Sequence, residues 1–132
     1  MIFPKAPKHN FKKGQTLVML LVLMTAGVII TSAAVVMIII NSQSSSKFAL
    51  GESAYAIAES GAENAILRLV RNPNYAGETL TVGSGTATIT VSGSSTKTIV
   101  SEGVRGNFRR KVQIVGTYVN NIFTPSSWTE ID

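Results

Sequence analysis

The two carboxylates best spaced for joint chemistry belong to Glu59 and Glu63, which are four positions apart. On a helix, residues four apart lie on one face, so the pair could perform acid–base catalysis or contact a partner protein. Catalytic pairs are far rarer than solvated or partner-facing helix edges, and we interpret the glutamates as such an edge. They are our candidates for contact with another chain.

Other side chains that enzymes use are scarce. His9 is the single histidine, Asp132 at the last position is the single aspartate, and cysteine is absent. This inventory yields neither a serine–histidine–aspartate set nor a metal-ligand cluster. Residues 83–85 read GSG, but a strand-like segment follows them, whereas a phosphate-binding loop leads into a helix. We therefore predict a hairpin turn there, and a protein that is not an enzyme, with no catalytic residue, metal or cofactor.

Basic residues gather in one place in the body of the chain, at Arg105, Arg109, Arg110 and Lys111. In an alternating strand these side chains divide between the two faces of the sheet, which favours a surface stripe. Phosphate binding needs only positive charge and is easily invoked, so we do not expect nucleic acid as a partner.

The net charge of +5 originates at the N-terminus. Lys5, Lys8, Lys12 and Lys13 precede an apolar segment with no acidic residue among them, and the other basic residues nearly balance the seven acidic ones. Basic flanks of this kind stay in the cytoplasm, which predicts that the N-terminus is inside and the body of the chain outside.

The segment from Thr16 to Ile40 has no charged residue and no proline. At a rise of ~1.5 Å per residue it would span roughly 38 Å as a helix, more than the ~30 Å of a bilayer core. Hydroxyl residues such as Thr25 can bond back to their own helix in lipid. A secretory signal would have an apolar region of about 7 to 15 residues, yet apolar residues here continue past the small pair Ala33-Ala34. We therefore predict a membrane helix.

An amphipathic helix follows in the sequence. Asn41 to Ser46 reads as a linker, although nothing in it forbids a helix, and beyond it apolar and polar side chains gather on neighbouring arcs. The apolar arc contains Phe48, Tyr55, Ala58, Ala62, Ala65 and Ile66, and the polar arc contains Glu52, Ser53, Glu59, Ser60, Glu63 and Asn64. Asn72-Pro73 ends the pattern, because proline disfavours helix in the residue before it.

The rest of the chain alternates with a period of two, which is typical of β-strands. The pattern predicts four strands separated by glycine-containing turns, at residues 78–82, 86–92, 97–103 and 108–118. A meander of this size needs a cover for its apolar face. The preceding helix is the available element, and we expect it to place Phe48, Tyr55, Ile66 and Leu69 on the sheet.

These elements define an α+β fold class. A long N-terminal helix, with a membrane half and an amphipathic half, packs on a small antiparallel β-meander in a lollipop shape. The predicted regions are a basic leader (1–14), a transmembrane helix (15–40), an amphipathic helix continuing outside (41–73) and a small β-sheet head (74–132).

The junction KKGQTLV, in which Gly14 precedes Gln15, resembles the leader of type IV pilin-like precursors. In that family prepilin peptidase cuts after the leader glycine on the cytoplasmic side and methylates the new N-terminus. The resemblance implies a cut between Gly14 and Gln15 and a membrane helix that stays attached. It also implies that the apolar helices of many subunits leave the bilayer and form the core of a filament.

Met19 occupies the fifth mature position, where this family usually has a glutamate. That carboxylate is thought to meet a neighbour's N-terminal amine, since a charge in lipid is costly unless it is paired. A chain without it resembles PilX-type minor pilins and K-type pseudopilins of type II secretion, and the K type is placed at the filament tip. The stretches AIAESGAENAILRL (56–69) and IVSEGVRGNFRRKVQI (99–114) also resemble these relatives, so the likeness covers nearly the whole chain.

The resemblance implies a minor pilin or pseudopilin, at the tip or in the initiation of a type IV pilus-like (fimbrium) or type II secretion-like filament. Its partners would be other pilin or pseudopilin subunits, contacted through the apolar helix and at Met19, Glu59 and Glu63, together with prepilin peptidase and an inner-membrane assembly platform. It would cross the cytoplasmic membrane once and then enter a cell-surface or periplasmic filament. The alternative is a single-pass membrane protein whose uncut helix anchors a small extracellular β domain with a binding function.

Overall fold

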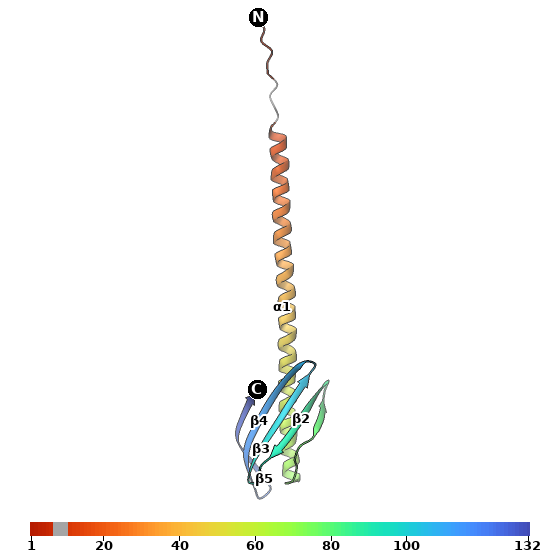
Figure 1. Ribbon diagram of the computed structural model, residues 1–132, viewed down its shortest axis with the longest axis vertical. Helices are drawn as coiled ribbons and strands as arrows, with labels where there is room; N and C mark the ends of the chain where they lie inside the picture. Colours follow the sequence, from red (N-terminus) through yellow and green to blue (C-terminus); the bar gives the residue numbers. More distant parts are fainter. Residues whose placement is uncertain (7–10) are drawn as a thin grey trace. The chain divides into compact units, whose positions relative to one another are not determined.

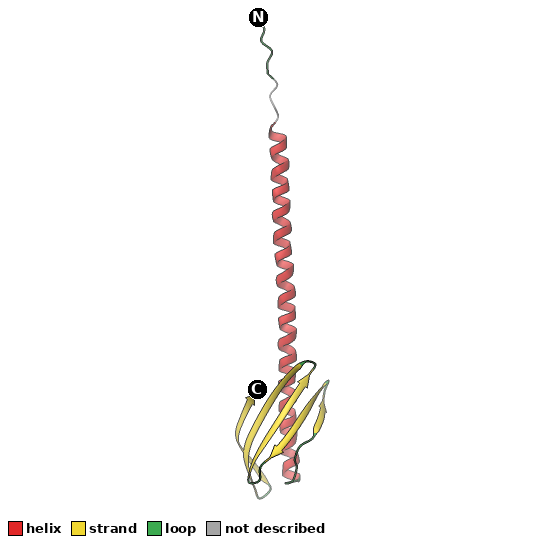
Figure 2. Cartoon of the chain, in the orientation of Figure 1, coloured by secondary structure: helices red, strands yellow, loops and turns green. Residues whose placement is uncertain are grey.

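The computed structural model describes residues 1–6 and 11–132, without the side chains of residues 11–13. The leader residues Lys8 and His9 therefore lie outside the described residues. The described elements are one helix, α1 (Phe11–Arg71), and five strands: β1 (Thr79–Val82), β2 (Gly85–Ser92), β3 (Thr96–Arg105), β4 (Phe108–Val119) and β5 (Ile122–Ile131) (Figure 1). The predicted α+β class is confirmed, because a long apolar N-terminal helix packs on an antiparallel sheet (Figure 2).

The chain divides into two compact units, residues 1–43 and residues 44–132. Unit 1 contains the N-terminal half of α1, and unit 2 contains the C-terminal half and all five strands. Residues 41–46, read as a linker in the sequence, are helical. The helix ends at Arg71, directly before the predicted stop at Asn72-Pro73.

The sheet of unit 2 is a meander in which each strand pairs antiparallel with the next, in the order β1-β2-β3-β4-β5. The register places Ala87 opposite Gly103 and Ser101 opposite Val112, and all four are buried on the face toward α1. The threonines of β2 lie on the other face and are exposed, as the alternation predicts.

The sequence pattern predicts four strands, and the structure has a fifth at the edge of the sheet. Asn120 and Asn121, both with positive φ, turn β4 back into β5. Pro125 within β5 has no backbone N–H to donate, which an edge strand tolerates. The pairing register of β4 with β5 shifts between Val115 and Gly116, which marks a β-bulge in this strand pair.

Small side chains form the helix side of the core. Ala58, Ala62, Ala65 and Leu69 are fully buried. They pack on Ile89, Val91, Ile99, Val112, Ile114 and Phe123 from the sheet. Burial of these apolar surfaces stabilises unit 2 by roughly 25 cal/mol for each Å² removed from water.

Three of the four aromatic and aliphatic side chains predicted to lie on the sheet do so. Leu69 is buried, and Tyr55 and Ile66 are half-buried against the core. The prediction for Phe48 is wrong, since this side chain is 75% exposed. Its helical phase matches that of Tyr55, but it lies about two turns earlier, beside Phe108 and Glu130 at the rim of the sheet, where it stays exposed.

Candidate functional site

The predicted cleavage junction lies near the start of α1. Gly14 and Gln15 are both exposed, and a Cβ on Gly14 would meet no atom within 4 Å apart from its chain neighbours and the nearby backbone of its own helix. The helix begins at Phe11, so the junction falls within the first two turns of α1. Both residues of the Gly14–Gln15 bond are therefore helical and exposed.

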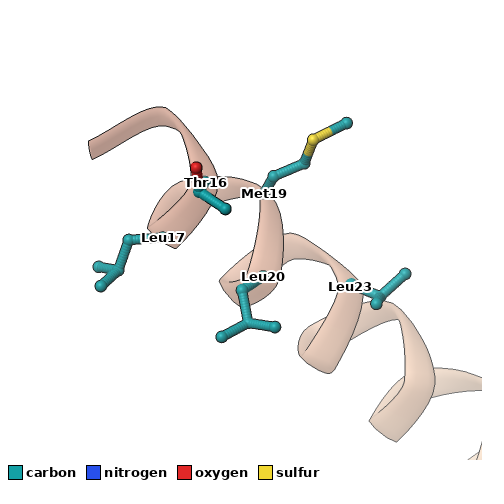
Figure 3. A pocket seen from close by; sticks show the side chains of 5 residues that line it. All are labelled: Thr16, Leu17, Met19, Leu20 and Leu23. Carbon is teal, nitrogen blue, oxygen red and sulfur yellow. The ribbon is translucent and has the colours of Figure 1, made fainter. Parts of the chain in front are cut away.

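Met19 lies on an apolar stretch of the same helix. Its side chain is 74% exposed, and the side chains around it belong to Thr16, Leu17, Leu20 and Leu23 (Figure 3). From Thr16 to Ile40 every residue is exposed, and most of them are large and apolar. This part of α1 thus presents apolar surface on all sides.

The hydroxyl groups in this apolar part are satisfied by the helix itself. The Oγ atoms of Thr25, Thr31 and Ser32 donate to the carbonyl oxygen four residues earlier, at 3.0, 2.9 and 2.7 Å. Hydrocarbon offers no other partner, so this arrangement suits lipid. Among the described residues, α1 is the one helix long and apolar enough to cross a membrane, which is compatible with a single-pass membrane protein.

The predicted contact residues Glu59 and Glu63 lie in unit 2, on the side of α1 away from the buried alanines. Glu63 is exposed and Glu59 is half-buried, and Glu52 lies on the same side about two turns before Glu59 and about three turns before Glu63. Their carboxylates form no ion pair or side-chain hydrogen bond with any residue that the structure describes. Met19 belongs to the other unit, and the contact role of all three residues stays a prediction.

The basic cluster divides between the faces of the sheet, as its alternation predicts. Arg109 pairs with Glu102 at 3.0 Å on the face away from α1, and Arg110 pairs with Glu130 at 2.9 Å on the face toward it. Two of the four cations in this cluster therefore pair with glutamates of the sheet, which leaves less free charge for a polyanion.

A polar cluster closes the C-terminal end of α1. Arg68 Nε lies 3.1 Å from Glu78 Oε1, and the Tyr75 hydroxyl donates to the same oxygen at 3.0 Å. Burial, helped by this hydrogen bond, raises the pKa of Tyr75 from its ordinary value of 10.0 to about 12. These contacts tie the helix end to the residues just before β1.

A shallow groove of about 220 Å³ lies beside α1 in unit 2 and combines three serine hydroxyls with one arginine. It is lined by Ser53, Ala56, Ile57, Ser60, Val82, Gly83, Ser84 and Arg105. The predictions from sequence did not include this groove. The sequence contained one part of the signal, because the alternation of β3 puts Arg105 in the row of Ser101 and Gly103, which face the helix.

Within residues 1–6 and 11–132, no three histidine, aspartate or glutamate side chains are placed to hold a metal ion. No protein-family model, no curated protein and no solved structure compared with the chain matches it.

Proposed function

We propose that this chain is a non-enzymatic subunit of a pilin-like filament. Prepilin peptidase removes its leader after Gly14 and methylates Gln15, the first half of α1 holds it in the cytoplasmic membrane, and an assembly platform then joins it to other pilin or pseudopilin subunits. One observation carries the proposal. In its first half α1 is apolar and exposed on every side, and in its second half it packs on the β-sheet of unit 2.

Large apolar side chains such as Ile29 and Ile39 gain free energy when they leave water. The exposed half of α1 therefore needs a cover, either lipid or the helices of other subunits. Its hydroxyl groups need no outside partner, so both covers suit the same surface. A subunit that moves from a bilayer into a filament core requires this property.

The lysine-rich leader supports an orientation with the N-terminus in the cytoplasm and the head outside. Protease added to intact spheroplasts should therefore remove residues beyond about Lys47. Protection of the head under these conditions contradicts the orientation.

Met19 supports a minor role, at the tip or in initiation. Without a carboxylate at this position, the chain cannot neutralise the N-terminal amine of a preceding copy inside an apolar core, and a buried unpaired charge costs several kcal/mol. Expressed alone with the assembly machinery, the chain should form no filaments, and Met19→Glu should increase its entry into the shaft. Homopolymers of the unchanged protein in electron micrographs would exclude the minor role and leave the filament subunit.

Intact-mass measurement of the membrane-extracted protein tests the proposal. Cells with an active prepilin peptidase should yield a chain that begins at Gln15 and carries one methyl group. Gly14→Leu should block the cut, whereas Gly14→Ala keeps a small residue and should be processed better. Recovery of the unchanged protein at full length would instead favour an uncut single-pass anchor with an extracellular binding domain.

A further inference from the structure

The groove beside α1 in unit 2 has the composition of an anion site. Ser53 and Ser60 come from α1, Ser84 comes from the turn between β1 and β2, and Arg105 comes from the end of β3. No carboxylate is among its lining residues. Three segments that are distant in the sequence thus place hydrogen-bond donors around one space.

Two arginines of unit 2, Arg71 and Arg105, form no ion pair or hydrogen bond within the described residues, and Arg71 is exposed on the last turn of α1. Arg68, Arg109 and Arg110 each pair with a glutamate, at 3.1, 3.0 and 2.9 Å. Arg105 is half-buried on the α1 side of the sheet, in the same row as Gly103, and makes no ion pair or hydrogen bond within the described part of the chain. A partly desolvated guanidinium without an acceptor favours an anion from outside.

The serine hydroxyls of the groove are also without partners. Thr25 and Thr31 show that a helix hydroxyl can donate to its own backbone. Ser53 and Ser60 make no such bond, and Ser84 makes none either, within residues 1–6 and 11–132. Their protons are available to the same anion that Arg105 would bind.

We propose that this groove binds a carboxylate side chain from the helix of a neighbouring, different subunit. This inference rests on the proposed function and names one contact of the filament subunit. Charge complementarity favours this occupant, because a guanidinium fork matches a carboxylate in a bidentate geometry and the hydroxyls supply further donors.

Size and surface chemistry favour this occupant. The groove, at about 220 Å³, is smaller than the ~300–1,000 Å³ of sites that enclose small-molecule ligands, and it suits one side chain. The outer side of α1 shows what a pilin-like helix can present, since Glu52, Glu59 and Glu63 form no ion pair in the described residues.

Acetate titration tests the chemistry directly. The full chain in neutral detergent micelles is labelled with ¹⁵N-arginine, and the Nε–Hε signals are followed at constant ionic strength against chloride. The Arg105 signal should shift and saturate, Arg109 should move little, and Ser53→Ala/Ser60→Ala should weaken acetate binding severalfold. Equal, unsaturated shifts at all arginines would overturn the proposal.

Assembly in cells that carry the other filament subunits tests the source of the carboxylate. Arg105→Gln should lower the amount of this protein in sheared filaments by about tenfold, a size expected for a lost charged hydrogen bond. The matched control Arg109→Gln removes a cation from the opposite face and should leave incorporation unchanged, and Arg105→Lys should restore part of it. Leader removal, measured in parallel, should be the same in all versions.

Arg105→Gln protein that is processed and incorporated normally would overturn the groove contact and leave the proposed function standing. A leader retained in the unsubstituted protein would instead remove the proposed function, and this inference with it.

Discussion

The two halves of α1 reverse the usual relation between side-chain size and burial. In the first half, large residues such as Ile29 and Leu23 are exposed, at 69% and 71%, whereas in the second half the small residues Ala58 and Ala62 are fully buried. Large apolar side chains normally fill protein interiors. The comparison indicates that the packing partner of the first half lies outside the chain, while the second half has its partner in the sheet.

Two glycines of the same helix show this difference at atomic scale. A Cβ added to Gly27 would meet nothing within 4 Å, whereas a Cβ added to Gly61 would lie 2.4 Å from Ser101 Oγ and 2.7 Å from Ala87 Cβ. The second half of α1 approaches the sheet so closely that one residue must lack a side chain. Paired substitutions in the two halves can therefore separate packing inside the chain from packing on an external partner.

The largest effect should come from removing the helix. A chain that begins at Glu78 loses the alanine and leucine side of the core, and a small one-sided sheet buries too little apolar surface to fold. A chain that begins at Ser44 keeps unit 2 and should unfold cooperatively in a thermal melt followed by circular dichroism. A cooperative transition in the shorter chain contradicts the role of α1 as cover.

Leu69→Ala should lower the free energy of unfolding of unit 2 by about 2–5 kcal/mol, since it opens a cavity at a fully buried side chain. Leu23→Ala is the matched change in the first half and should leave head stability unchanged. Urea unfolding of the full chain in micelles, followed by near-ultraviolet circular dichroism, measures both. Equal losses would mean that the two halves are not independent.

Gly61→Ala should have a smaller effect. Alanine is favoured over glycine in a helix by ~1 kcal/mol, but the added methyl group overpacks the contact at a cost of roughly 1–3 kcal/mol. Gly61→Ala should therefore lower the free energy of unfolding of unit 2 by about 1 kcal/mol, whereas Gly27→Ala should leave it unchanged. If both variants stabilise the protein in the same urea assay, the close helix–sheet contact is absent.

A further effect, confined to alkaline pH, concerns Tyr75, which lies just beyond the end of α1. Its folded-state pKa is raised, so the unfolded chain loses the phenol proton first and the stabilisation present below pH 10 declines as pH rises toward 12. The difference in unfolding free energy between the unchanged protein and Tyr75→Phe should therefore shrink over this range. A difference independent of pH would show that Tyr75 titrates normally.

Strong periodicity made most of the fold predictable from the sequence. The alternation in β2 predicts its buried and exposed faces, and proline at position 73 predicts the end of α1. β5 was missed because Pro125 weakens a strand pattern, and only its place at the sheet edge makes the proline acceptable. Phe48 was misplaced because the helical phase predicts which side of α1 a residue lies on, but it does not predict how far the sheet extends along the helix.

The candidate site was predictable only in part. The apolar segment can be read from the composition of the sequence, whereas the junction at Gly14 is predicted from its resemblance to the leaders of type IV pilin-like precursors. The groove at Arg105 could not be assembled in advance, because Ser53, Ser84 and Arg105 meet only when the β1–β2 turn reaches the flank of α1. Which arginine lacks a glutamate depends on strand register, and register was not specified by the pattern alone.

The strictly sequential order of the strands has a consequence for how the head is made. Each strand pairs with the one synthesised just before it, so loop closure is short at every step and the contact order of the sheet is low. The covering helix is also the earliest part of the head to be synthesised. The nascent chain can therefore add β1 to β5 one at a time onto a helix that is already present. If the chain is translocated outward, as the proposed function requires, folding can keep pace with translocation and few apolar strand edges remain unpaired.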